Sequence, residues 1–161
     1  MKNTITIFSI LILCLLCIST TNFEEERNFK CMIQMKNYSG KGAYIIISLV
    51  DKNGKYEQTL NVQGDDPEWY HEITSWWKFY GKKRNNIDAI TGETLSGGER
   101  SINVISLDKS KMNSNYKLRF ETAVEDKNYF EKDIEIELDK INSETKYNGN
   151  GFIRYVRILE N

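Results

Sequence analysis

The sequence predicts an all-β fold, an antiparallel two-sheet sandwich with one short aromatic helix. Short apolar segments rich in Ile, Val, Tyr and Phe recur along the chain, and clusters of Asn, Asp, Gly, Ser and Lys separate them. Only one segment has the periodicity of an amphipathic helix. About seven strands with such turn signals favour an immunoglobulin-like sandwich, and a small barrel is the alternative.

Apolar patterning indicates where each strand lies. Residues 43–50 are nearly continuously apolar, which is typical of a central strand covered on both faces. Residues 56–62 alternate, so we expect one face of that strand to meet solvent. The Asn-Gly pair within residues 51–55 predicts a tight hairpin turn between these two strands. Further strands are expected near residues 29–33, 101–107, 116–124, 133–138 and 151–159.

Residues 67–80 predict the helix. Asp66 and Pro67 suit its first turn, and Gly81 with the basic residues after it suits its end. The apolar stripe of this helix consists of Trp69, Ile73, Trp76, Trp77 and Tyr80. One interpretation is that these side chains cover the open end of the sandwich. The other is that Trp76 or Trp77 stays partly exposed and stacks on a planar ligand such as a flavin ring or a sugar.

The N-terminus predicts export. Residues 1–21 have a cationic start, an apolar run and small polar residues at the end, which is typical of a secretory signal peptide. The apolar run is shorter than the roughly 20 residues that cross a bilayer, so we expect no transmembrane span after its removal. Residues 22–161 are then one periplasmic or extracellular domain. A lipid anchor at Cys17 is the minor alternative, and Cys31 is expected to be a buried free thiol.

Charge and motif content exclude several classes of function. The 161 residues include 22 Lys and Arg against 23 Asp and Glu, scattered along the chain, which argues against a nucleic-acid partner. The single histidine, His71, lies among aromatic residues, and no zinc-ligand cluster or Gly-x-Ser-x-Gly motif accompanies it. We expect neither a metal site nor catalytic residues, and a protein that is not an enzyme is favoured.

The order of several motifs resembles that of a known family. Residues 40–44, residues 50–56, the aromatic pairs on the predicted helix and residues 87–92 follow one another as in the bacterial exported family called domain of unknown function 2271. The similarity covers most of the mature chain. It implies an exported domain found alongside extracytosolic flavin and iron-reduction systems.

A local resemblance suggests a cofactor. Residues 88–94 are similar to the Asp-x-x-[Ser/Thr]-Gly-Ala-[Ser/Thr] signature at which FMN is joined covalently in sodium-pumping NADH:quinone reductases. The resemblance implies that Thr94 is the acceptor hydroxyl and that Thr91 and Gly92 form the turn exposing it. It also implies that Asp88 is recognised by the magnesium-dependent transferase. Glu93 stands where the signature has alanine, and the alternative is a plain exposed loop.

Two functions therefore remain open. The first is an exported soluble protein of an extracytosolic redox or flavin system, a covalent FMN carrier whose partners are a flavin transferase and membrane redox proteins. The second is a non-enzymatic binding or protein-interaction module of the cell envelope, with a sheet face or the surface of Trp76 and Trp77 holding a glycan or another exported protein.

Overall fold

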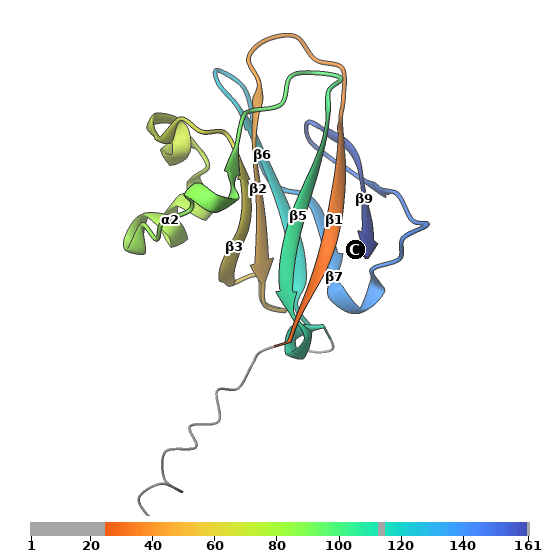
Figure 1. Ribbon diagram of the computed structural model, residues 1–161. Coiled ribbons are helices and arrows are strands. Elements are labelled where there is room, and N and C mark those ends of the chain that lie inside the picture. Colours follow the sequence, from red (N-terminus) through yellow and green to blue (C-terminus); the bar gives the residue numbers. More distant parts are fainter. Residues whose placement is uncertain (1–24, 113–114, 161) are drawn as a thin grey trace, which may run out of the picture.

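The computed structural model describes residues 25–112 and 115–160, and in them two separate sheets face each other (Figure 1). All strand pairs are antiparallel except β3 with the two-residue strand β4. The predicted all-β sandwich is confirmed, and the separation of the sheets excludes the small barrel. The predicted signal peptide, Cys17 and the boundary at residue 22 lie outside the described residues.

The first sheet has the strand order β5-β1-β9-β8. Its central pair is antiparallel, with Cys31 opposite Ile158 and Ile33 opposite Val156. Both pairs point into the sandwich and are fully buried. The bounds of these strands are Glu26–Met35 for β1, Arg100–Asp108 for β5, Tyr147–Asn148 for β8 and Ile153–Glu160 for β9.

The second sheet has the order β4-β3-β2-β6-β7. Strand β2 lies at its centre and is buried along its whole length, as predicted. The hairpin to β3 turns at Asp51, whose carboxylate accepts hydrogen bonds from the backbone N–H groups of Asn53 and Lys55, while Gly54 has a φ of +82°. The bounds are Ala43–Val50 for β2, Tyr56–Gln63 for β3, Thr91–Gly92 for β4, Lys117–Val124 for β6 and Tyr129–Glu137 for β7.

The inner faces of the two sheets form the main core. Alternate residues of each strand enter it, because successive side chains of a strand point to opposite faces. Cys31 lies in this core as the expected buried free thiol, and burial raises its pKa to about 12. The protonated thiol is therefore inert at neutral pH. Three single-turn 3-10 helices lie in connections before or between strands: η2, Asp88–Ile90; η3, Lys109–Lys111; and η4, Leu138–Lys140.

A helical layer covers the outer face of the second sheet (Figure 1). The prediction of one helix over residues 67–80 is corrected: a 3-10 helix, η1, spans Pro67–Glu72 and an α-helix, α2, spans Thr74–Lys83. Ile73 separates them with φ −82° and ψ 67°, a conformation that neither helix continues. Asp66 caps η1 as predicted, whereas α2 continues through Gly81 and ends at Arg84, which has a φ of +45°.

The position of this layer also corrects the expected role of the aromatic stripe. Trp76, Tyr70 and Ile73 are buried against Tyr44 and Ile46 on the outward side of β2, so they cover a sheet face and not the open end of the sandwich. The second half of β3 is consequently buried on both faces, and the expected solvent-facing side exists only near its start. No helix within residues 25–112 and 115–160 is long and apolar enough to span a membrane.

Candidate functional site

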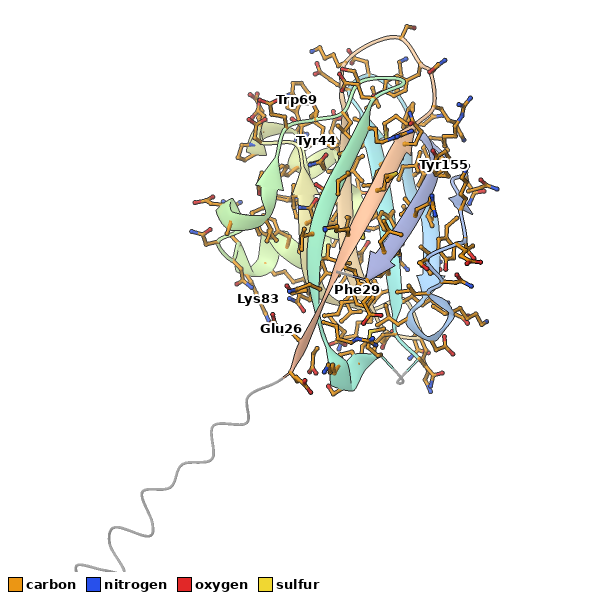
Figure 2. The ribbon with its side chains drawn as sticks, turned by 45° about the vertical axis from the view of Figure 1, so that its right-hand side comes forward. Glu26, Phe29, Tyr44, Trp69, Lys83 and Tyr155 are labelled. Atoms are coloured by element: carbon orange, nitrogen blue, oxygen red, sulfur yellow. The ribbon has the colours of Figure 1, made fainter. Side chains whose placement is uncertain are left out.

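Two hollows lie side by side where the second half of α2 passes over the start of β3. The first, here called the amide pocket, has a volume of about 330 Å³, and the second, the lysine pocket, has a volume of about 540 Å³. Glu57, Phe79 and Lys83 line both. The two pockets are therefore neighbouring parts of one groove, with Phe79 between them. Lys83 lies on the same side of the molecule as Trp69 of the helical layer, and Tyr155 lies on the other side (Figure 2).

The amide pocket combines apolar side chains with amides. Ile87 and Ile90 follow α2 and supply aliphatic surface, while Asn85, Asn86 and Gln58 supply amide groups. The backbone N–H of Asp88 donates to the Asn86 side-chain oxygen over 2.8 Å, which fixes the orientation of that amide. A pocket of this composition suits a ligand with both hydrogen-bond donors and acceptors.

The lysine pocket carries mainly positive charge. Its lining includes Lys55 from the hairpin and Lys78, Lys82 and Lys83 from α2, against only two carboxylates. Lys78 and Lys82 are four residues apart and share one side of the helix. The pocket therefore favours an anionic group.

Tyr56 and Phe79 form an aromatic wall of the lysine pocket. Their rings stack with centroids 5.4 Å apart and an interplanar angle of 17°. The Arg119 guanidinium lies 5.2 Å from the centroid of the Tyr56 ring, and the Tyr56 hydroxyl donates to Glu121 over 2.7 Å. Tyr56 is thus held by three neighbours, so the wall is rigid before any ligand arrives.

A buried charged cluster lies behind this wall on the outer face of the second sheet. Glu121 is fully buried on β6 and accepts hydrogen bonds from the hydroxyls of Tyr56 and Tyr129. Arg119 is 2 % exposed and pairs with Glu135 at 2.8 Å and with Glu131 at 3.1 Å. The two buried charged groups, Arg119 and Glu121, therefore have partners, as burial of charge requires.

Burial changes the acidity of this cluster. It raises the pKa of Glu121 to about 7, against the opposing effect of the two tyrosine hydrogen bonds and the Arg119 charge. Burial and the adjacent carboxylate also raise the pKa of Tyr56 and of Tyr129. The tyrosines remain protonated donors at neutral pH, whereas Glu121 titrates in that range.

The residues of the predicted FMN motif follow the edge of the second sheet. Asp88 is exposed in η2, and Thr91 and Gly92 form β4, which pairs in parallel with the end of β3. The Thr91 hydroxyl donates to the Ile87 carbonyl over 2.8 Å. Thr94 is half-buried beside Gly42, where an added Cβ would lie only 2.3 Å from its Oγ1.

The predicted tryptophans lie elsewhere along the sheet. Trp76 is completely buried, donates from Nε1 to the Thr59 hydroxyl over 2.9 Å and stacks on Tyr80 at 4.6 Å. Trp77 is half-buried, with the Arg84 guanidinium 5.5 Å from its ring centroid. Trp76 contacts the middle of β3, whereas Thr94 contacts the segment before β2. Among the described residues, no hydrogen bond or ring contact joins Thr94 to Trp76 or Trp77.

The groove itself was missed by the sequence interpretation. The basic residues after Gly81 were attributed to the end of a helix, and residues 116–124 to a strand, with no role given to Arg119 or Glu121. The sequence feature that could have indicated the groove is the spacing of Lys78 and Lys82, with Phe79 between them. This spacing indicates a groove only when α2 is known to pack over β3.

Fold and groove together define a class: a two-sheet β-sandwich domain with a helix-lined groove on the outer face of one sheet. A family model described as predicted periplasmic protein (DUF2271) matches residues 26–155. The chain belongs to this family, which confirms the predicted resemblance. The description also confirms the exported, periplasmic location expected from the leader. Comparisons with curated proteins and with solved structures gave no significant match.

Proposed function

We propose that this protein is a non-enzymatic binding module of the periplasm that holds a glycan in the amide pocket. The observation that carries the proposal is the set of side-chain amides beside apolar surface in a pocket of about 330 Å³. Ligand pockets of about 300–1,000 Å³ with a few convergent polar groups are typical of small-molecule sites.

Sugar chemistry matches this lining. Each sugar hydroxyl both donates and accepts a hydrogen bond, and each side-chain amide offers the complementary acceptor and donor. Asn85, Asn86 and Gln58 supply three such amides, and the C–H face of a pyranose ring packs against Phe79 and Ile87. Such a site needs no catalytic group, which agrees with a binding module.

A glycan array of bacterial oligosaccharides tests the proposal with the mature protein. We expect retention of a subset of glycans by the wild-type chain. Asn86→Ala and Phe79→Ala are expected to weaken retention by about tenfold or more, because each removes a hydrogen bond or an apolar contact in the pocket. Asn148→Ala is the matched control, since Asn148 is exposed on β8 of the other sheet, and its retention should equal that of the wild type.

Retention of no glycan by the wild-type chain contradicts the proposal. Equal retention by the wild type and both pocket variants contradicts it as well, since the glycan would then bind elsewhere.

A covalent FMN carrier of an extracytosolic redox system is the second candidate. Its support is the motif of residues 88–94 and the partial exposure of Thr94 at the sheet edge. A flavin transferase would take FMN from FAD: the Thr94 hydroxyl would form the phosphoester bond as the pyrophosphate bond of FAD breaks and AMP leaves. Membrane redox proteins would be the further partners. The backbone of Gly42 lies close to this hydroxyl, since a Cβ added at Gly42 would lie 2.3 Å from Thr94 Oγ1.

Co-expression with a flavin transferase and intact-mass measurement test this candidate. A carrier gains the mass of one FMN less water, and Thr94→Ala does not. Thr145→Ala, at an exposed site outside the motif, is the control and should gain the same mass as the wild type. An unchanged mass under conditions that modify a known transferase substrate rejects the candidate.

A further inference from the structure

We infer that the ligand is an acidic oligosaccharide, with neutral hydroxyls in the amide pocket and a carboxylate beside Lys78 and Lys82 in the lysine pocket. This inference rests on the proposed function and names the chemical class of its ligand.

Continuity of the two pockets is the first argument. Glu57, Phe79 and Lys83 line both hollows, so one extended ligand passes from one to the other across Phe79. The two hollows have volumes of about 330 and about 540 Å³, which gives room for more than one sugar unit.

Unbalanced charge is the second argument. Glu57 pairs with Lys55 at 3.6 Å, and Glu131 pairs with Arg119 at 3.1 Å, so both carboxylates of the lysine pocket already have a cation. Among the described residues, no carboxylate lies within 4.0 Å of the amines of Lys78, Lys82 and Lys83. Three lysines without a carboxylate partner in the described part of the chain therefore line one hollow, which is an arrangement that favours binding of an external anion.

The positions of the pocket lysines differ from those expected if they served only to stabilise the C-terminal end of α2. Lys82 and Lys83 lie in the last turn of α2, where cations also offset the negative end of the helix dipole. Lys78 lies one turn earlier, and Lys55 belongs to the hairpin. The helix dipole therefore does not account for the charge of the pocket as a whole.

The aromatic wall favours a sugar acid over an acidic peptide. Stacking on Tyr56 holds the Phe79 ring in place beside the lysines, and a pyranose ring offers a C–H face that packs on an aromatic ring. A flexible acidic peptide has no such face and loses more conformational freedom on binding. A uronic acid has both a sugar ring that packs against the aromatic wall and a carboxylate that pairs with the lysine amines.

Isothermal titration of the mature protein at low salt tests the inference. The probes are trimers of galacturonic, mannuronic and guluronic acid, each compared with its own methyl ester, in which every carboxylate is replaced by an uncharged ester group. We expect at least one acid to bind about tenfold or more tightly than its ester, because a hydrogen bond between a lysine and a carboxylate is stronger than one to a neutral ester.

The double variant Lys78→Gln with Lys82→Gln should remove this preference, while its affinity for the ester stays that of the wild type. The matched control is Lys30→Gln with Lys146→Gln, which removes the same charge from the other sheet and from a loop beside Tyr155. This control should keep the preference for the acid.

The outcomes separate the inference from the proposed function. Equal binding of every acid and its ester, with array glycans still held in the amide pocket, overturns the acidic ligand and leaves the binding module. Loss of the preference in the control variant overturns the placement of the carboxylate, because general charge then explains it. An Asp-Asp-Asp peptide that binds as tightly as the best acid overturns the glycan and indicates a protein partner.

Discussion

Glu121 is the residue whose environment differs most from what its strand pattern suggests. It alternates with apolar residues on β6, as a solvent-facing acid would, yet it is fully buried beneath Tyr56 and Tyr129. Its carboxyl holds both tyrosines, and Tyr56 in turn forms a wall of the lysine pocket. The protonation of one buried group is therefore linked to the stability of the groove.

Stability should fall as Glu121 ionises. Its pKa is about 7 in the folded chain against 4.5 for an ordinary glutamate, so the folded state binds more protons than the unfolded state between those values. The contribution of this group is full below the unfolded pKa and is lost as the pH rises through about 7. The loss amounts to at most about 3 kcal/mol.

Glu121→Gln tests this prediction by urea denaturation. The variant keeps an acceptor but does not ionise, so its free energy of unfolding relative to wild type should rise by up to about 3 kcal/mol between about pH 5 and about pH 8. Glu144→Gln, at an exposed site, is the control and should show no such trend. A difference between Glu121→Gln and wild type that is constant with pH contradicts the raised pKa.

At the scale of elements, the helical layer is attached to the second sheet mainly through Trp76. Its ring stacks on Tyr80, packs against Tyr70 and donates a hydrogen bond to Thr59. Because α2 bears one wall of the groove, the attachment of this helix determines the shape of both pockets.

Trp76→Ala should destabilise the protein by about 3–5 kcal/mol, since it leaves a large cavity and an unpaired Thr59 hydroxyl. Trp77→Ala, at the half-buried neighbour, should cost about 1 kcal/mol. Urea unfolding of both variants measures the two values. Equal losses for the two tryptophans would show that α2 is not docked through Trp76.

Element by element, the strands were predictable and the helical layer was only partly so. Continuous burial of residues 43–50 and the hairpin at 51–55 follow from local patterns of apolar and turn residues. The break at Ile73 does not, because 3-10 and α-helices place aromatic residues at similar spacings. Tertiary packing determines which face of the sheet the helix covers, and local sequence does not. The burial of Arg119 and Glu121 depends on that packing.

The candidate site was less predictable than the fold for the same reason. Asn85 and Asn86 are ordinary turn residues in the sequence, and they become pocket-lining amides only where α2 ends beside the start of β3. Thr94 could be singled out by a local motif because such a motif needs no tertiary contact. Its contact with Gly42 joins segments far apart in the chain.

At the scale of the whole molecule, the residues that form the main core differ from those that line the proposed binding groove. The main core between the sheets holds Cys31, Phe120 and their neighbours, and it contributes no residue to either pocket of the groove. The groove lies outside this core, on the side of the second sheet that bears α2. Substitutions at the exposed lysines should therefore leave the unfolding free energy within about 0.5 kcal/mol of wild type.

Chemical-shift mapping of the mature protein tests the central claim most directly. Backbone amide shifts are recorded during titration with the best-retained glycan. The account predicts that the largest changes fall on residues 55–59 and 78–90, which line the groove, with little change on β1, β5 and β9. Changes concentrated on β1, β5 and β9, or around Thr94, would contradict a binding site beside α2.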